Sequence, residues 1–466
     1  MKTSLRRIAA ALAASLAFSG IWMTWLVTDA ASRYRNDPRN VRSQQAGYLP
    51  GAGRIITADR VIVAIDDSNG ERQYPEGVAY AHIVGYDAAS GRSGIEQSRY
   101  AALRVRDDGS ITDWLLGLGD GGTRQPHDVV LTVHDPLQQV ARDALGGKTG
   151  AVVVIDVATG AVFAYVSSPA YDPNQVVAGS LDPEESADAT LDRAADRVLP
   201  PGSTFKVIVA AAALDVGANP DTPFTDSEEY LAPGAGSPIR NASDGFCSDG
   251  NTLTLTDALV VSCNTVFAAL AVDLGGASVV GAARRAGFGT VIPWETGAAR
   301  SSLTGADVLE ADDGALAQTG IGERDVRVTP LLMALIASSI GNGGVAMQPF
   351  VVGAILTPSG DVIAQTEPAP FTRMFSSAVA ADLRTMMTEV VTRGTGTAAQ
   401  VDGLIVSGKT GTAEGSGGPH AWFIGIAGHD NPEIAIAVVV ESGGSGGRVA
   451  APIAAEVLKM WRDLSG

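Results

Sequence analysis

The chain has 466 residues and a formal net charge of −18, from 33 basic and 51 acidic side chains. This acidity excludes a protein that binds nucleic acid by neutralising its phosphates. With 45% hydrophobic and 18% charged residues, and 55 glycines without a short period, the chain is neither disordered nor collagen-like, which leaves a globular protein of two or three domains.

The N-terminus predicts export. Lys2, Arg6 and Arg7 precede residues 8–27, which carry no charge and, at about 1.5 Å per residue, would span a hydrocarbon core of about 30 Å. A cleaved signal peptide is the alternative, because small residues follow at 28–30, but signal h-regions run only about 7 to 15 residues. We therefore predict a cytoplasmic tip and signal-anchor at residues 1–29, a single pass through the cell membrane, and an extracytoplasmic remainder.

Residues 30–128 contain short alternating runs and predict a small strand-containing domain, either a rigid spacer or a docking surface. A strand at 129–133 follows, then a helix with Asp135 as N-cap and Pro136 at its first position, ending at Leu145. Two β-branched runs, 151–156 and 161–166, are separated by four residues and predict a hairpin.

An alanine-rich helical region is predicted from Ser203 to about Gly341. The chain then returns to strands at 405–413, 421–427 and 434–441, and ends in a helix over 451–461. Early strands, a helical centre and late strands predict one α/β domain over 129–466, whose sheet is assembled from both ends of its sequence and covered by helices.

The sequence has two cysteines, Cys247 and Cys263, and five histidines without HxxxH spacing, so we predict neither a metal site nor a cofactor. Export would permit a Cys247–Cys263 disulfide, whose tether is worth roughly 3 kcal/mol for a loop of this length. Two buried free thiols are the alternative.

Ser203 and Lys206 open a predicted helix three residues apart, a spacing that puts both side chains on one face. A neutral lysine amine there can take the serine proton, and the helix N-terminus favours the developing negative charge. The pair is a candidate nucleophile with its own base. By itself the spacing is weak evidence, because an ordinary helix start with a solvated lysine has the same pattern.

Two further motifs follow in order. Ser262-Cys263-Asn264 lies 59 residues after Ser203, and Lys409-Thr410-Gly411-Thr412 lies 147 residues after Ser262, in a predicted strand. Together with Ser-x-x-Lys, these motifs resemble those of penicillin-binding proteins and class A β-lactamases.

Two other matches fail on context. Lys148-Thr149-Gly150 precedes Ser203 and is interpreted as a loop. The Gly-x-Ser-x-Gly pattern at 443–447 has no histidine after it, so it predicts a flexible glycine loop and no Ser-His-Asp triad.

The resemblance to class B penicillin-binding proteins extends over residues 315–322, 328–331, 341–344, 409–414 and 420–423. Residues 36–40 and 94–96 are similar to the actinobacterial penicillin-binding protein A group. One departure is that the family's Arg-Gly-x-Ile reads Ala52-Gly53-Arg54-Ile55 here, which puts the salt bridge of its first arginine in doubt. The resemblance implies a serine β-lactamase-like transpeptidase domain, with a mainly antiparallel sheet flanked by helices.

The resemblance also implies roles. Ser203 would be acylated by the penultimate D-alanine of a peptidoglycan stem peptide, Lys206 would accept its proton, and Ser262 with Lys409 would relay that proton to the departing D-alanine. Thr410 and Thr412 would bind the terminal carboxylate, and Asn264 the substrate backbone amide. The backbone NH groups of Ser203 and Thr412 would form the oxyanion hole, and Gly411 would let the substrate approach the strand. Cys263 would point away from the site.

The implied partners are stem peptides, β-lactam antibiotics, a membrane glycosyltransferase and division or elongation proteins. A β-lactamase is disfavoured because no Glu-x-x-Leu-Asn element lies between Ser262 and Lys409 to activate water. A D,D-carboxypeptidase, a β-lactam sensor and an idle divisome scaffold stay open. About 100 residues before the catalytic region leave no room for a glycosyltransferase domain.

Overall fold

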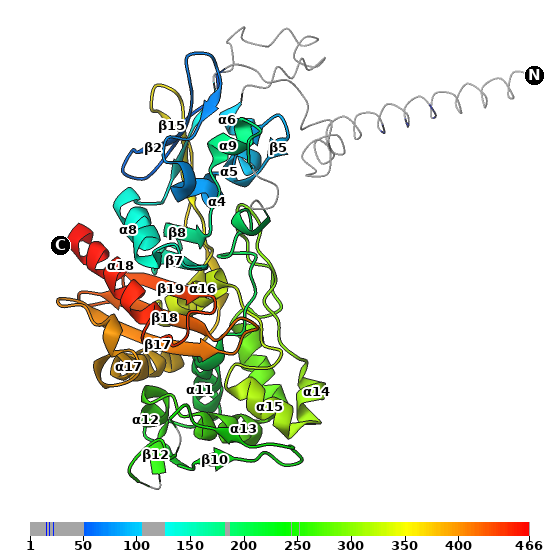
Figure 1. Ribbon diagram of the computed structural model, residues 1–466, viewed down its shortest axis with the longest axis vertical. Helices are drawn as coiled ribbons and strands as arrows, with labels where there is room; N and C mark the ends of the chain where they lie inside the picture. Colours follow the sequence, from blue (N-terminus) through cyan, green and yellow to red (C-terminus); the bar gives the residue numbers. More distant parts are fainter. Residues whose placement is uncertain are drawn as a thin grey trace, which may run out of the picture.

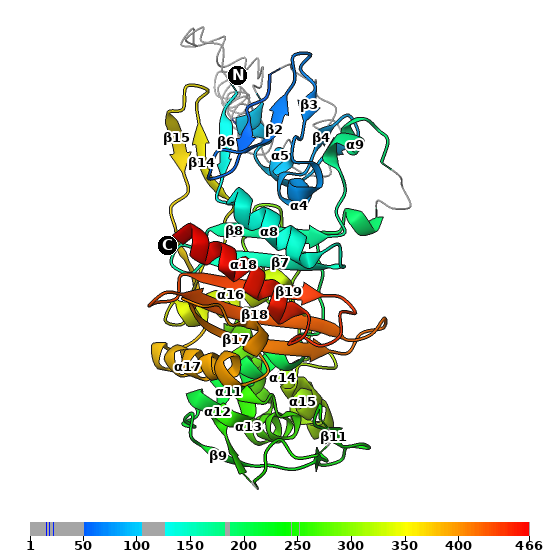
Figure 2. The same cartoon turned by 60° about the vertical axis from the view of Figure 1, so that its left-hand side comes forward.

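The computed structural model describes residues 51–104, 126–181, 187–243, 245–250 and 252–465, together with Ser15, Phe18 and Trp22 (Figure 1). The predicted anchor at 8–27 lies outside the described residues except for those three. The described chain forms an elongated molecule in which a six-stranded sheet, a five-stranded sheet and a helical region follow one another along the long axis (Figure 2).

The central sheet has five antiparallel strands in the order β17-β18-β19-β7-β8. Its bounds are β7 (Gly150–Asp156), β8 (Val162–Ser168), β17 (Ile405–Ala413), β18 (His420–Gly428) and β19 (Ile434–Val440). Strands β18 and β19 are buried along their whole length, as expected for continuous apolar runs covered on both faces. The prediction of one sheet built from both ends of the domain is confirmed.

Helices cover both faces of this sheet. Successive side chains of a strand point to opposite faces, so Val152 packs with α8 (Asp135–Leu145) and α18 (Ala450–Ser465), whereas Val153 packs with α16 (Pro330–Gly341). The predicted helix over 135–145 is present, but His134 and not Asp135 is its N-cap. Helix α17 (Ser377–Arg393) packs along the edge strand β17, and η4 (Thr397–Ala399) follows it.

The predicted continuous helical region from 203 to 341 is interrupted by short strands. Its helices are η3 (Gly202–Phe205), α11 (Lys206–Asp215), α12 (Leu255–Val260), α13 (Asn264–Arg285), α14 (Ala306–Glu310) and α15 (Asp313–Gly320). The strands are β9 (Pro223–Thr225), β10 (Glu229–Tyr230), β11 (Ile239–Arg240) and β12 (Thr252–Thr254), which form two small hairpin-like sheets. Two- and three-residue strands carry too little periodicity to be seen in the sequence.

In the part of the chain that the structure describes, one helix, α13, is long and apolar enough to span a membrane. More than half of its apolar stretch is buried within the protein, where it packs against α11 and α15. It is therefore a core helix of the helical region.

The six-stranded sheet has the order β15-β14-β6-β1-β2-β3. Its strands are β1 (Ile55–Ile56), β2 (Ile62–Asp66), β3 (Arg72–Gln73), β6 (Asp128–Leu131), β14 (Val352–Leu356) and β15 (Val362–Gln365). Smaller elements of the remaining chain are η2 (Gly77–Tyr80), α4 (Ala81–Val84), β4 (Asp87–Ala88), β5 (Gly91–Arg92), α5 (Gly94–Ser98), α6 (Tyr100–Leu103), α9 (Pro173–Val177), β13 (Val345–Met347) and β16 (Pro370–Arg373). Segments on both sides of residue 129 thus share this sheet.

A buried cluster of charges joins these N-terminal elements. Arg72 donates to Glu96 at 2.6 Å and to Asp66 at 3.1 Å, and the side chains of Arg72 and Glu96 are fully buried. Arg104 pairs with Asp66 at 3.2 Å and with Asp87 at 3.1 Å. At position 52, where the family has arginine, the Ala52 amide also donates to Asp66 at 2.7 Å. Arg72 and Arg104 therefore supply positive charge close to position 52, where this chain has alanine in place of the family's arginine.

Candidate active site

The candidate nucleophile Ser203 lies in the 3₁₀ turn η3, and α11 begins only at Lys206. The prediction that a helix opens at Ser203 is thus corrected by one turn. Pro200 and Pro201 before the turn cannot donate backbone hydrogen bonds and so favour an abrupt start. The turn packs directly against β17, because a side chain at Gly411 would have its Cβ 2.7 Å from the Pro201 carbonyl oxygen.

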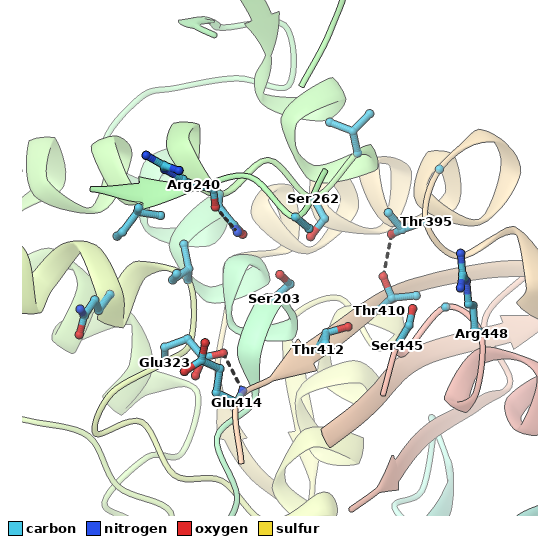
Figure 3. A pocket seen from close by; sticks show the side chains of 18 of the residues that line it. Ser203, Arg240, Ser262, Glu323, Thr395, Thr410, Thr412, Glu414, Ser445 and Arg448 are labelled. Carbon is cyan, nitrogen blue, oxygen red and sulfur yellow. Dashed lines mark hydrogen bonds between the residues drawn. The ribbon is translucent and has the colours of Figure 1, made fainter. Parts of the chain in front are cut away.

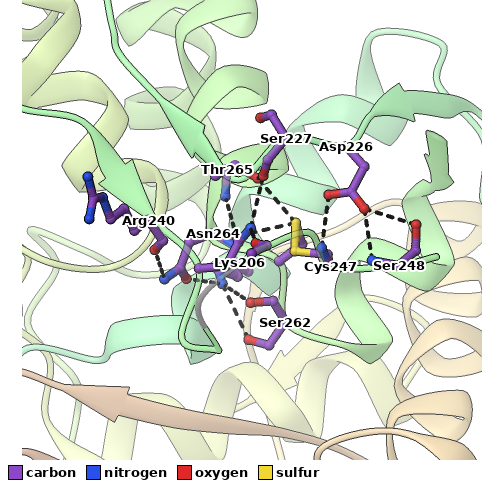
Figure 4. The surroundings of a disulfide bond; sticks show 12 residues. Lys206, Asp226, Ser227, Arg240, Cys247, Ser248, Ser262, Asn264 and Thr265 are labelled. Atoms are coloured by element: carbon purple, nitrogen blue, oxygen red, sulfur yellow. Dashed lines mark hydrogen bonds between the residues drawn. A yellow bond between two sulfur atoms is a disulfide. The ribbon is translucent and has the colours of Figure 1, made fainter. Parts of the chain in front are cut away.

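Lys206 is completely buried at the first turn of α11. Its Nζ donates to the carbonyl oxygen of Ser262 at 2.7 Å, to Asn264 Oδ1 at 2.7 Å and to Ser262 Oγ at 3.3 Å (Figure 4). Burial, and next the positive charge of Lys409, lower the pKa of Lys206 well below its ordinary value, while Glu323 acts in the opposite direction. A lysine with this environment holds a neutral amine more readily than an exposed one.

Ser262 lies between two lysine amines. Lys409 Nζ donates to Ser262 Oγ at 2.8 Å and to the carbonyl oxygen of Thr410 at 3.0 Å. Burial lowers the pKa of Lys409 to about 7. Ser262 adopts a left-handed backbone with φ of 61°, a conformation uncommon outside glycine and found at strained functional positions. The hydroxyl is therefore placed to exchange protons with both amines.

An open cleft of about 920 Å³ lies above these groups (Figure 3). Of the residues singled out in the sequence, Ser203, Ser262, Asn264, Thr410 and Thr412 line it, and Lys206 and Lys409 are buried beneath. Segments 59 and 206 residues apart from Ser203 along the chain are thus brought together.

Gly411 has a structural role in addition to the one predicted. It is buried, and any side chain there would collide with Pro201 and Thr204 of the nucleophile turn. The glycine therefore lets η3 lie directly against β17.

Asn264 is engaged within the protein through both ends of its amide. Its Oδ1 accepts from Lys206, its Nδ2 donates to the Arg240 carbonyl oxygen at 2.9 Å, and its backbone NH donates to Asn241 Oδ1 at 3.1 Å. In this state Asn264 holds Lys206 and connects it to β11 at the rim of the cleft.

The structure contains a Cys247–Cys263 disulfide, with the two cysteines 16 residues apart (Figure 4). Cys263 is buried behind the cleft and ties the Ser262–Asn264 turn to the loop that carries Cys247. Asp226 lies beside both sulfurs, but it accepts from the backbone NH groups of Cys247 and Ser248. The cluster therefore supports the backbone of this loop.

Several cleft residues were not identified from the sequence. Thr395 shares a 2.7 Å hydrogen bond with Thr410, and Glu323 accepts from the Glu414 backbone NH at 3.2 Å. Burial raises the pKa of Glu323 to about 7, and the charge of Glu414 adds to this. Glu323 directly follows the 315–322 segment that resembles the family, so its charge next to Gly-Ile-Gly was a usable signal. Thr395 has no such signal in its neighbourhood.

The glycine-rich segment 443–447 also belongs to the cleft. Ser445, Gly447 and Arg448 line it, and the Gly446 NH donates to Thr412 Oγ1 at 3.3 Å. The segment is a loop between β19 and α18, and Gly446 packs on β17 beside Gly411. Lys148, in the other rejected motif, lies in a turn before β7, where its backbone NH donates to the Leu145 carbonyl oxygen at 3.1 Å.

Comparisons with known proteins identify relatives of the whole described chain. Residues 150–459 match the family model for the penicillin binding protein transpeptidase domain, and residues 52–129 match that for the penicillin binding protein A dimerisation domain. The chain is 34% identical to peptidoglycan D,D-transpeptidase PbpA of Mycolicibacterium smegmatis, over 97% of each chain, and 32% identical to PbpA of Mycobacterium tuberculosis, over 98% of this chain and 99% of that one.

Solved structures agree with this match. The penicillin G acyl-enzyme complex of penicillin-binding protein A from M. tuberculosis is similar with a TM-score of 0.79 and 32% identity, covering 89% of this chain and 100% of that one. The D,D-transpeptidase domain of a peptidoglycan glycosyltransferase from Eggerthella lenta gives a TM-score of 0.79 and 32% identity, covering 90% and 100%.

Proposed function

The chain belongs to the penicillin-binding protein transpeptidase family, and on that premise we propose that it is a peptidoglycan D,D-transpeptidase that forms an acyl-enzyme on Ser203. The observation that carries the proposal is the Ser262 hydroxyl between two buried lysine amines, at the floor of a cleft that Ser203 lines. This arrangement supplies a nucleophile, a neutral base and a proton relay in one place.

Acylation begins with proton transfer from Ser203 Oγ to the neutral Nζ of Lys206. The oxygen attacks the carbonyl carbon of the penultimate D-alanine, and a C–O bond forms as the carbonyl becomes an oxyanion. When the oxyanion collapses, the C–N bond breaks and the proton passes from Lys206 through Ser262 to the departing D-alanine amine. The hydrogen bonds of Ser262 Oγ with Lys206 at 3.3 Å and with Lys409 at 2.8 Å support this route.

The terminal carboxylate of the donor peptide would orient the peptide in the cleft. Thr410, Thr412 and Arg448 lie together on one side of Ser203, with Lys409 beneath, and would receive the terminal carboxylate (Figure 3). The backbone NH groups of Ser203 and Thr412 would stabilise the oxyanion, and one such donor is typically worth about 2.7 to 4 kcal/mol of the barrier. Asn264 would bind the peptide backbone while it keeps Lys206 in place.

The acyl group is then transferred to an amine of a second stem peptide. Lys206 and Ser262 run the proton route in reverse, because the amine enters where the D-alanine left. A D,D-carboxypeptidase uses the same groups with water as acceptor, and it is the second candidate.

We further propose that residues 1–29 anchor the enzyme in the cell membrane by a single pass, with residues 30–128 as a non-catalytic domain and 129–466 as the catalytic domain outside it. The match of residues 52–129 to a dimerisation domain supports a role in protein contacts for this part. A membrane glycosyltransferase and division or elongation proteins are the partners proposed, because the matched transpeptidase domain supplies the cross-linking reaction.

The test is labelling of the intact chain with a fluorescent penicillin, together with mass spectrometry of products from two stem peptides. We expect stable labelling and a cross-linked product with loss of one D-alanine. Ser203→Ala should abolish both, whereas Ser359→Ala, on an exposed turn between β14 and β15, should change neither.

Four outcomes would contradict parts of the proposal. An unlabelled intact chain would remove the enzyme hypothesis, and labelling of Ser203→Ala would move the nucleophile elsewhere. Release of D-alanine without a cross-linked product would identify a carboxypeptidase, and loss of the label within seconds would indicate a β-lactamase.

A further inference from the structure

The turn after α15 contacts both segments that would form the oxyanion hole. The Gly322 carbonyl oxygen accepts from the backbone NH of Gly202, the residue before Ser203, at 3.0 Å. The next residue, Glu323, accepts through its carboxylate from the backbone NH of Glu414 at 3.2 Å. Two adjacent residues thus hold both segments. Gly322 binds the nucleophile turn through its backbone carbonyl, and Glu323 binds the end of β17 through its side chain.

Glu414 lies at a point where the sheet no longer holds the strand. The pairing of β17 with β18 ends at Ala413 opposite His420, so the Glu414 NH is the first beyond the ladder. Without Glu323 this NH would have only solvent, and the last residues of an edge strand fray easily. Thr412, the proposed oxyanion donor, lies just two residues earlier.

The backbone of Gly322 also lies very close to the backbone of the nucleophile turn. Gly322 has φ of 79°, in the left-handed region that favours glycine, and a Cβ there would overlap the Gly202 carbonyl oxygen. A side chain at position 322 would therefore push the nucleophile turn away from the Gly322–Glu323 turn.

We propose that the Gly322–Glu323 turn is a brace that sets the width of the oxyanion hole, with Glu323 as a positioning residue for acyl transfer. This inference rests on the proposed function, because it assigns the Ser203 and Thr412 NH groups to the oxyanion. It gives Glu323 no direct contact with the substrate. Glu323 keeps the two backbone donors, the Ser203 NH on η3 and the Thr412 NH on β17, at a fixed separation.

The charge of Glu323 has a separate consequence. Its carboxylate faces Glu414 from the end of β17, Lys206 from α11 and Arg327 from its own segment, with Arg324 next to it in the cleft wall. A negative Glu323 raises the pKa of Lys206 and so opposes the neutral amine that acylation needs. Glutamine keeps an acceptor oxygen for the Glu414 NH but removes the charge, so the two effects can be separated.

The experiment compares Glu323→Ala and Glu323→Gln with the unaltered chain. The readouts are the second-order rate of acylation by a fluorescent penicillin across the neutral pH range, the fraction of chain acylated at completion, and the thermal midpoint. Glu310→Ala is the matched control, since Glu310 likewise accepts from a backbone NH, that of Ala277 at 2.8 Å, but lies outside the cleft.

We expect Glu323→Ala to acylate about 10- to 100-fold more slowly, since small misplacements of catalytic groups have effects of this size. Its thermal midpoint should fall no further than that of Glu310→Ala, whose acylation rate should be unchanged. Glu323→Gln should stay within a few-fold of the unaltered rate, and its pH–rate profile should move to lower pH because Lys206 loses a stabilising negative charge.

The brace is overturned if Glu323→Ala acylates at the unaltered rate, or if Glu323→Gln is as slow as Glu323→Ala. A profile of Glu323→Gln that moves to higher pH would contradict the coupling to Lys206. Failure of the proposed function looks different, because then the unaltered chain itself would not be acylated at Ser203.

Discussion

Two regions of this protein bury cations, and they treat them in opposite ways. In the N-terminal cluster, Arg72 and Arg104 each meet carboxylates within 3.2 Å. Beneath the cleft, Lys206 and Lys409 are equally buried, but they donate hydrogen bonds to hydroxyl, amide and carbonyl oxygens. The first region keeps its charges by pairing them, and the second lowers the pKa of its amines.

The difference follows from desolvation. A buried cation loses its hydration, and it recovers that free energy only from a well-placed anion. An arginine cannot release its proton, so it needs the carboxylate, whereas a lysine without one becomes neutral and basic. A buried cation with a counterion is therefore structural here, and one without it is available for chemistry.

Removing the unpaired amine should have the largest effect on activity. For Lys206→Met we expect the acylation rate to fall about 10²- to 10⁴-fold, the range that a general base supplies. Stability should change little, because the variant buries no charge. Stopped-flow acylation and thermal unfolding measure the two quantities. Strong destabilisation with an unchanged acylation rate would show that Lys206 is a structural residue and not the general base.

Removing a counterion should have the opposite pattern. Glu96→Gln removes the charge of one of the carboxylates that pair with the buried Arg72, and we expect a loss of about 3 kcal/mol in the free energy of unfolding. Acylation of the folded fraction should be unchanged. Urea unfolding and burst-phase labelling measure these.

The matched control is Glu389→Ala, which breaks a solvent-accessible pair with Arg393 on α17. Such pairs are worth about 0.3 to 0.5 kcal/mol. Equal losses in the two variants would show that burial does not separate the two kinds of pair.

The smallest expected effect is a pH dependence of stability. Burial lowers the pKa of Lys409 to about 7 in the folded chain, from an ordinary value of 10.5. Between these values the unfolded chain binds more protons, so this residue makes stability rise with pH across that window. Below pH 7 the folded chain carries the full penalty of a buried charge. Lys409→Met should flatten the rise measured by urea unfolding between about pH 7.5 and 9, and an unchanged slope would contradict the lowered pKa.

How far the site could be predicted depends on the range of each signal. Ser203 and Lys206 are local, so their spacing alone suggested a nucleophile and base. Ser262 and Lys409 were found through order and resemblance, since nothing in their own neighbourhoods reports that they meet. The long strands β18 and β19 were predicted within one or two residues because continuous burial leaves an unbroken apolar run.

Other features had no local signal. The two-residue strands of the helical region, the 3₁₀ turn at Ser203 and the contact of Gly411 with Pro201 all arise from packing between distant segments. By contrast, Glu323 had a local signal, a charge directly after Gly320-Ile321-Gly322, but the Glu414 NH that it binds lies 91 residues away.

The sequence by itself determined the chemistry available: an acidic chain, a charge-free N-terminal stretch, and serine and lysine motifs in a fixed order. Only the tertiary structure decided what those groups are worth. A lysine becomes a base, and an arginine a structural cation, according to how much water and which partners the fold leaves around it. Those surroundings come from segments tens to hundreds of residues apart, so they exist only once the chain has packed.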